Sequence, residues 1–344
     1  MAKITDVARR AGVSPSTVSY ALSGKRPISD ATRRRVQAAV RELGYRTDGG
    51  RSRSGARAKV LALAVPMRPG IHVPVVTQFA VSVVTAARAR DHDVLLLTQG
   101  EGDEGIGRVT DSGLADGVIV TDVQLQDPRL PLLRSCALPS VLIGVPAEAD
   151  GLTCVDLDFR AAGELCVDHL AGLGHRAVAL VGSPPEVYVR RTAFARRLVE
   201  GFTAAADRHG LASVALPCGT GRDAARAVVE RLLRDLPALT AVVVHNEPLV
   251  DPLIEAFEEL GMRVPGELSL TAVCPAPVAA AARVPVTSVA VPTAELGARA
   301  VHLLVRKLSG APVPGTTLLP PRLTERASTA PRGHQGLSGG SGRG

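Results

Sequence analysis

The fold of this chain is decided by residues 3–45, which read KITDVARRAGVSPSTVSYALSGKRPISDATRRRVQAAVRELGY. Four apolar residues of this stretch recur at the spacing of one helix face, namely Ile4, Val7, Ala8 and Ala11. Thr5 is suited to cap this first helix, and Gly12 is suited to end it. We therefore predict a short amphipathic helix that stops at a tight glycine turn.

A second short helix is predicted directly after this turn, over about residues 15–22. Ser14 is a good N-cap, and Pro15 suits the first helical position because its missing N–H would have no partner there. The helix would bury its apolar residues, Val18 with Leu22 or Ala21. Its other face would be polar and would present Ser16, Thr17, Ser19, Tyr20 and Ser23.

A third helix completes this unit. Ser29 is its expected N-cap and Gly44 its expected end, and its apolar stripe consists of Val36, Ala39, Val40 and Leu43. Two short helices joined by a tight turn are typical of a helix-turn-helix, whose second helix enters the major groove of DNA. The pattern therefore predicts a three-helix, DNA-binding head.

Positive charge is concentrated in the same part of the chain. Residues 1–59 contain 3 Lys and 11 Arg against 4 acidic residues, a net charge of +10, whereas the whole 344-residue chain carries +7. A small helical bundle with merely polar faces would not need this excess, but a phosphate-binding module does. Arg33, Arg34 and Arg35 are candidates for phosphate contacts. We therefore predict that residues 1–46 bind double-stranded DNA.

Residues 47–59 are rich in Gly, Ser and Arg and contain no apolar residue larger than Ala. This composition predicts a flexible, basic linker. Two interpretations are open. Arg51, Arg53 and Arg57 can bind the minor groove as an extended arm, or the segment only tethers the head.

Residues 60–330 alternate between strand and helix patterns. Residues 60–65 form a continuous apolar run, as a buried parallel strand requires. Two successive series of this kind predict an α/β core of two lobes with doubly wound parallel sheets and a ligand cleft between them. The predicted lobes are residues 60–158 with 291–320, and residues 159–290 with 321–330. The remaining residues, 331–344, are predicted to be disordered.

Several classes of protein are disfavoured. No run of 18 uncharged apolar residues occurs, so we expect no membrane span. The five cysteines are scattered and lack CxxC spacing, which favours a reducing cytoplasm over a disulfide framework or a zinc site. We expect no metal and no cofactor.

One motif suggests an enzyme. Residues 100–105, GEGDEG, match the GxGxxG pattern that binds dinucleotides after a strand. Glu101, Asp103 and Glu104 would repel a pyrophosphate at this place, so a surface loop is favoured. A doubly wound nucleotide-dependent enzyme with a DNA-binding head is therefore only a remote alternative, and no catalytic residues are assigned.

The stretches ITDVARRAGVSPSTVSYALSG and ISDATRRRVQAAVRELGY resemble the head of the LacI family of bacterial transcription regulators. The core stretches VDLD from Val155, GHRAVALVGSP from Gly174 and VTSVAVP from Val286 resemble the core of the same family. The resemblance implies a periplasmic-binding-protein-like core, a homodimer and a near-palindromic DNA operator. It also implies a repressor whose operator binding is modulated by a small molecule in the cleft.

The resemblance suggests which residues contact DNA, and this chain departs from the family at two places. Tyr20 stands where the family often has Arg, so the operator preference should differ from that of typical relatives. The Leu that relatives wedge into the minor groove falls near Ser54, so that wedge is missing here. The expected DNA contacts are Thr5, Ser14, Ser16, Thr17, Ser19, Tyr20, Ser23, Arg33, Arg51 and Arg53.

Three positions are expected to contact an effector. Arg197 precedes Gly201-Phe202 by four residues, whereas the family spacing is usually three, where Leu198 stands here. Asn246 matches the family, and Cys274 replaces an Asp. A sugar, a different metabolite and no effector are therefore all open, and the last would leave a regulator that acts constitutively or under a partner protein.

Overall fold

The computed structural model describes residues 4–23, 28–43, 58–65, 73–98 and 104–332. The described head consists of α1 (Ile4–Ala11), α2 (Pro15–Ser23) and α3 (Asp30–Glu42). Their buried residues form a small apolar core of Val7, Ala8, Ala11, Val18, Val36 and Ala39. Gly12 has a φ of +64°, a left-handed conformation that glycine adopts without steric cost.

The predicted caps are confirmed for two of the three helices. The Ser14 hydroxyl accepts a hydrogen bond of 3.1 Å from the Thr17 N–H at the start of α2. Ser29 accepts the equivalent bond of 3.2 Å from the Thr32 N–H at the start of α3. Each bond satisfies one of the N–H groups that a first turn leaves unpaired.

Thr5 does not cap α1, contrary to the prediction. The helix begins at Ile4, so Thr5 already lies inside its first turn. The apolar spacing identifies the buried face but not the first residue, and for this reason the expected start was late. The cap of α1 and the predicted end of α3 at Gly44 both lie outside the described residues.

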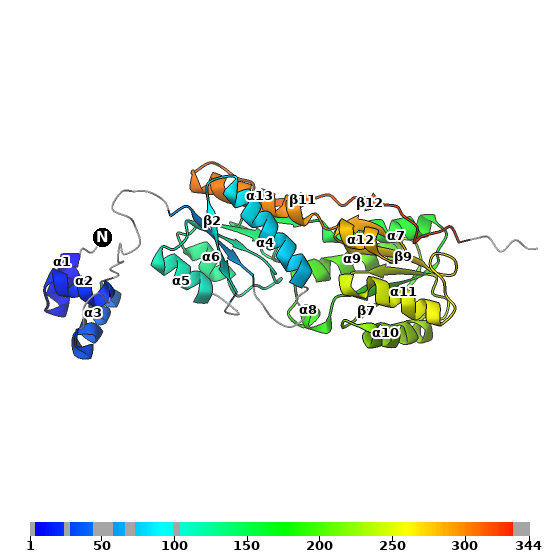
Figure 1. The fold of residues 1–344 in the computed structure, drawn as a ribbon, viewed down its shortest axis with the longest axis horizontal. Helices are drawn as coiled ribbons and strands as arrows, with labels where there is room; N and C mark the ends of the chain where they lie inside the picture. Colours follow the sequence, from blue (N-terminus) through cyan, green and yellow to red (C-terminus); the bar gives the residue numbers. More distant parts are fainter. Residues whose placement is uncertain (1–3, 24–27, 44–57, 66–72, 99–103, 333–344) are drawn as a thin grey trace, which may run out of the picture.

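The first lobe is built on a parallel sheet of order β11-β5-β4-β3-β1-β2 (Figure 1). Its strands are β1 (Val60–Ala64), β2 (Asp93–Leu97), β3 (Gly117–Val120), β4 (Ser140–Ile143), β5 (Cys154–Leu157) and β11 (Thr316–Leu319). One face is covered by α4 (Val73–Arg88) and α13 (Thr293–Leu308), which pack against each other. The other face is covered by α5 (Glu104–Ser112) and α6 (Leu130–Ser135).

The second lobe has a sheet of order β12-β10-β9-β8-β6-β7, in which only the short β12 is antiparallel. Its strands are β6 (Ala177–Gly182), β7 (Ala212–Pro217), β8 (Ala241–Val244), β9 (Ser269–Cys274), β10 (Thr287–Ala290) and β12 (Leu323–Thr324). One face packs on α7 (Phe159–Gly172) and α9 (Ala193–Arg208). The other packs on α10 (Arg222–Asp235), α11 (Val250–Glu259) and α12 (Ala276–Ala281).

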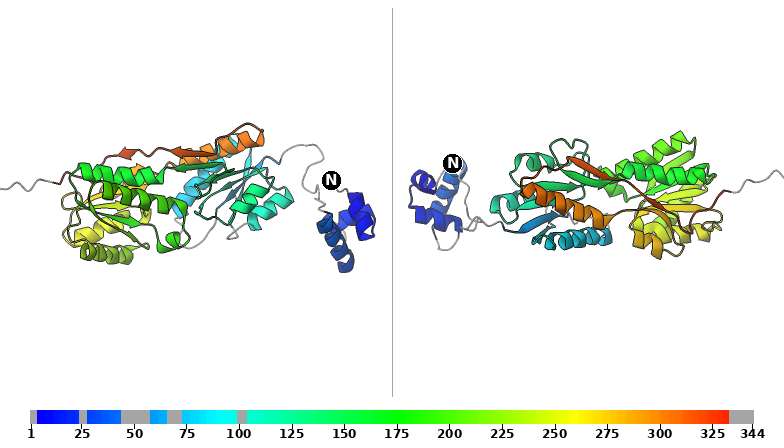
Figure 2. Two further views of the ribbon diagram at one scale, coloured as in Figure 1. Left: turned by 180° about the vertical axis from the view of Figure 1, so that it is seen from behind. Right: turned by 90° about the horizontal axis from the view of Figure 1, so that it is seen from above.

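The chain passes between the lobes three times, after β5, after β10 and after β11. Figure 2 shows the last of these passages as a segment that runs from β11 to β12 along both lobes. The predicted α/β class with two parallel-sheet lobes is confirmed. Among the described residues, no helix has the length and apolar character that a bilayer span requires.

The sequence did not reveal the shortest helices. These are α6, α8 (Pro185–Val189), α12 and the 3-10 turn Glu247–Leu249. Each has six residues or fewer, which is too short to display a helical period. Two of them, α8 and the 3-10 turn, carry residues that line the cavity between the lobes.

Candidate functional site

The head presents hydroxyl groups at the start of α2. Ser14, Ser16 and Ser19 are exposed, and Thr17 and Tyr20 are half-buried. The Ser14 hydroxyl shares hydrogen bonds of 2.8 Å with the hydroxyls of Ser16 and Thr17. These side chains can donate and accept hydrogen bonds, as contacts with base edges and phosphates require.

Basic residues surround this helix, and some of them are engaged within the head. Arg9 pairs with Asp6 at 3.2 Å, and Arg10 pairs with Glu42 at 2.7 Å. On α3, Arg34 and Arg35 are exposed and Arg33 is half-buried. Thr5 is exposed on α1. The side chain of Ser23, together with Arg51 and Arg53, lies outside the described residues.

A cavity of about 790 Å³ lies between the two lobes of the core. The residues that follow the carboxyl ends of parallel strands form much of its wall, including Thr121 after β3, Gly144 after β4 and Ser183 after β6. Ligands of open α/β sheets bind at this end of the strands. The volume is in the usual range for small-molecule sites.

An aromatic cluster forms one wall of this cavity. Phe159 opens α7, Phe194 opens α9 and His245 follows β8. The centroids of the Phe159 and Phe194 rings are 5.5 Å apart, and His245 lies 5.7 Å from the first and 5.5 Å from the second. Phe79 of α4 contributes a further ring from the first lobe.

Two titratable groups of the cavity have strongly shifted pKa values. Burial raises the pKa of Asp156 to about 7, although the Leu157 N–H donates to its carboxylate and Arg197 lies near it. Burial lowers the pKa of His245 to about 4, against the opposing charge of Glu247. The imidazole is therefore uncharged at neutral pH, and Asp156 titrates near neutrality.

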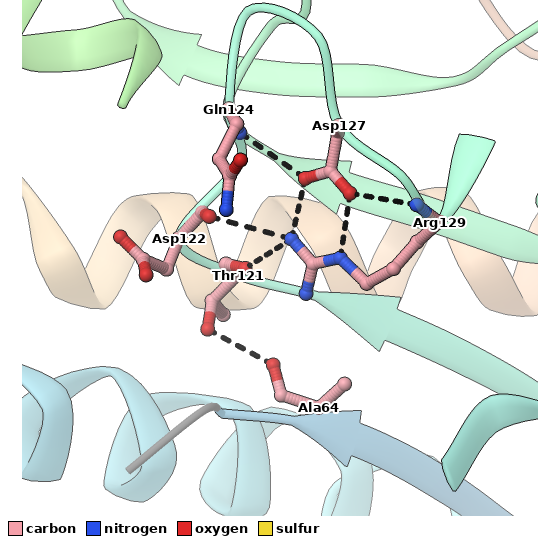
Figure 3. A network of polar contacts seen from close by, with 6 residues as sticks. All are labelled: Ala64, Thr121, Asp122, Gln124, Asp127 and Arg129. Atoms are coloured by element: carbon pink, nitrogen blue, oxygen red, sulfur yellow. Dashed lines mark hydrogen bonds and ion pairs between the residues drawn. The ribbon is translucent and has the colours of Figure 1, made fainter. Parts of the chain in front are cut away.

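The loop after β3 is fixed by a buried ion pair between Asp127 and Arg129 (Figure 3). The guanidinium donates to both carboxylate oxygens, at 2.8 and 2.6 Å, and to the carbonyl oxygens of Thr121 and Asp122 at 3.0 and 3.3 Å. The carboxylate also accepts the N–H of Gln124. Burial alone would raise the pKa of Asp127, but the hydrogen bond and charge of Arg129 outweigh it and lower the pKa.

The same loop joins the two lobes. Gln124 forms an isolated antiparallel β-bridge with Thr192, just before α9. The Ala193 N–H donates to the Val123 carbonyl oxygen at 2.9 Å, and the Leu125 N–H donates to the Arg191 carbonyl oxygen at 3.0 Å. The wall of the cavity on this side is therefore continuous backbone across both lobes.

The structure brings one of the three expected effector residues to the cavity. Asn246 lines it, and its Nδ2 donates to the carbonyl oxygens of Cys218, Gly219 and Gly182. Arg197 is not among the described lining residues, because its guanidinium crosses to the first lobe and donates to the carbonyl oxygens of Val145 and Pro146.

The other two positions face the protein interior. Cys274 is not among the described lining residues and is 1% exposed, and burial raises the pKa of its thiol to about 12. Leu198, at the family's usual arginine position, is fully buried in the core of the second lobe.

Sequence reasoning missed the aromatic cluster and Asp156. A signal was present, because Phe159, Phe194 and Phe79 are three of only five Phe residues in the chain. No group of three or more His, Cys, Asp or Glu side chains in the described part of the chain is arranged to hold a metal ion.

Comparisons with known proteins agree with this architecture. Residues 3–48 match the model of the bacterial regulatory proteins of the lacI family, and residues 167–329 match that of a periplasmic binding protein-like domain. The chain is 29% identical to the HTH-type transcriptional regulator MalR of Streptomyces coelicolor, over 95% of this chain and 96% of that protein. It is 29% identical to the maltose regulon regulatory protein MalI of Escherichia coli, over 89% and 92%.

Solved structures give the same result for the whole chain. The complex of the transcriptional regulator CelR with cellobiose superposes with a TM-score of 0.68 at 25% identity, over 95% of this chain and 100% of that one. The lac repressor dimer bound to operator and an anti-inducer superposes with a TM-score of 0.69 at 22% identity, over 96% and 99%. With its helix-turn-helix head and its periplasmic-binding-protein-like core, the chain belongs to the LacI family of DNA-binding transcriptional regulators.

Proposed function

We propose that this regulator is a homodimeric repressor whose operator binding is modulated by a small molecule between the lobes, and that it has no catalytic activity. The observation that carries the proposal is the combination, in one chain, of the exposed hydroxyl face of α2 with an interlobe cavity of about 790 Å³. In this proposal, residues 1–46 are the DNA-binding head, 47–59 the linker, 60–330 the two-lobed core and 331–344 a tail.

The proposed DNA contacts are divided by position on the head. Ser16 and Tyr20 of α2 read base edges, because the start of the second helix of a helix-turn-helix enters the major groove. The other contacts hold the phosphates or the minor groove, and they are Thr5, Ser14, Thr17, Ser19, Ser23, Arg33, Arg51 and Arg53. A Tyr in place of a bidentate Arg predicts an operator that differs from those of typical relatives.

Dimerisation is supported by an apolar surface on the first lobe. Val81 and Val84 of α4 are 59% and 47% exposed, and Leu96 of β2 is 49% exposed. The strand β2 is the last of its sheet among the described residues, beside α4. A second copy of the chain would cover these side chains and place two heads on a near-palindromic operator.

The effector step follows from the position of the cavity. Both lobes line it, so a bound ligand would favour one arrangement of the lobes over another. MalR, MalI and CelR carry names or titles that refer to sugars. A sugar is therefore the first class of ligand to test, and a different metabolite is the second. We place the protein in the cytoplasm because that is where operator DNA is found.

In vitro selection tests the proposal. The purified full chain is mixed with a random duplex library at moderate salt, and the retained DNA is sequenced. We expect a two-fold symmetric site, and we expect Tyr20→Arg to change its sequence while Arg134→Leu, on the core, leaves it unchanged. Retention without sequence preference would refute a specific regulator, and an asymmetric single site would refute the dimer.

A further inference from the structure

The described lining of the interlobe cavity suits an apolar ligand better than a saccharide. Val65, Val76, Val123, Ile143 and Leu296 contribute aliphatic walls from the first lobe and from α13. Saccharides are usually held by side chains that present paired donors and acceptors to their hydroxyl groups, and planar apolar ligands are held by hydrophobic and aromatic walls with few polar groups.

The polar groups that would recognise a saccharide are engaged or replaced. The Asn246 amide nitrogen already donates to backbone carbonyl oxygens, at 2.8 Å to Cys218. Leu198 fills the core at the position where an arginine would otherwise enter the site. Cys274, where a carboxylate would otherwise stand, is a buried thiol.

Aromatic side chains are instead concentrated at this cavity. Aromatic residues make up 2% of the chain, yet Phe79, Phe159 and Phe194 all line the cavity. The remaining two, Phe202 and Phe257, are in the core of the second lobe. Rings at centroid distances near 5.5 Å offer the tilted and edge-on surfaces that a further aromatic ring prefers.

His245 adds a neutral ring to the cluster. It is 5% exposed and packs against Phe159 and Phe194. Its Nδ1 has no hydrogen-bond partner among the described residues, which is uncommon for a buried nitrogen. A polar atom on a ligand next to this ring would supply that partner.

We infer that the interlobe cavity binds a compact, mainly apolar ligand that carries an aromatic ring, and that it does not bind a saccharide. The ring would pack against Phe159, Phe194 and His245 in the second lobe and meet Phe79 from the first. This inference rests on the proposed function, because it names the class of effector for the site that the proposed function uses.

A fluorescence titration of the full chain with N-phenyl-1-naphthylamine tests the inference. The probe is aromatic and neutral, which suits a lining that includes Asp122, Asp156, Glu186 and Glu247. We expect saturable binding at one site per chain, without displacement by millimolar maltose or cellobiose. The absence of saturable binding, or displacement of the probe by either sugar, would overturn the inference.

Matched variants locate the probe. Phe194→Leu removes an aromatic face while keeping an apolar side chain, and we expect an affinity about 3- to 10-fold weaker. Phe257→Leu makes the same change in the core away from the cavity and should leave the affinity unchanged. If Phe194→Leu does not fold, Val76→Trp on α4 fills the cavity and should abolish binding. Equal affinities of the wild type and the folded cavity variants would overturn the inference.

The selected operator separates this inference from the proposed function. Operator affinity is measured by fluorescence anisotropy with and without the probe. A probe that binds in the cavity and leaves operator affinity unchanged supports the ligand class, while the proposed effector step fails. A chain that binds a symmetric operator but not the probe overturns the ligand class alone.

Discussion

Replacing Arg129 with leucine tests whether the ion pair with Asp127 holds the loop that closes the cavity. Both side chains are buried, at 7% and 1% exposure, and the guanidinium makes two bonds to the carboxylate and two to loop carbonyls. The leucine variant leaves a buried carboxylate with only backbone N–H partners from Gln124 and Arg129. Removing one partner of a buried pair costs about 3–5 kcal/mol.

The pH dependence of this cost has a definite sign. In the wild type the pKa of Asp127 is lowered, so its contribution to stability is present above pH 3.8 and is lost as the pH falls through the lower folded value. In Arg129→Leu, the burial that raises this pKa is no longer outweighed by Arg129. The carboxyl then takes up a proton more readily, and the deficit should shrink between pH 8 and pH 5.

Urea unfolding followed by far-ultraviolet circular dichroism measures the deficit against the wild type at each pH. Arg134→Leu is the control, since that arginine is exposed in the same lobe and its Nη2 donates only to the Glu148 carbonyl oxygen. The double variant Asp127→Leu with Arg129→Leu should recover part of the loss, because no buried charge is left unpaired. A deficit below about 1 kcal/mol, the level of an exposed pair, or one of equal size at both pH values, would refute the reasoning.

Three further predictions concern the core. Asp156→Asn should stabilise the chain by about 2–4 kcal/mol at pH 8, because the raised pKa near 7 means that stability is lost as the pH rises through that value; the gain should shrink at pH 5 in parallel unfolding curves. Gly201→Ala should destabilise by about 1–3 kcal/mol, since a Cβ there would lie 1.9 Å from the Arg160 carbonyl oxygen, whereas Gly172→Ala meets no atom within 4 Å and should not destabilise; equal thermal midpoints would contradict this packing argument. Val84→Glu should shift the sedimentation coefficient to that of a monomer, and an unchanged value would rule out this surface as the interface.

Local patterns predicted most of the secondary structure. The apolar spacing around Val7 and Val36 identified the buried faces of α1 and α3, and the hydroxyls of Ser14 and Ser29 identified two helix starts. Continuous apolar runs identified the strands, including β1, because parallel strands are covered on both faces. The starts and the shortest helices were less accessible, since a helix of one turn has no measurable period.

The cavity was predicted in place but not in character. The alternation of strands and helices predicts two lobes, and ligands of such folds bind between them. Whether a given side chain reaches the cavity depends on the phase of its helix or strand. Arg197 and Leu198 are neighbours in the sequence, yet one crosses to the first lobe and the other fills the core of the second.

The sequence by itself determined the class of this protein: the DNA-binding head, the α/β core with two lobes, and the family. These properties rest on short-range spacing, capping residues and local charge, which need no knowledge of distant contacts. Only the tertiary structure decided the chemistry of the cavity. Phe159, Phe194 and His245 lie on three separate elements and meet only when β8 lies beside the starts of α7 and α9. Burial, which sets the pKa values of Asp156 and His245, is likewise a property of the assembled lobes.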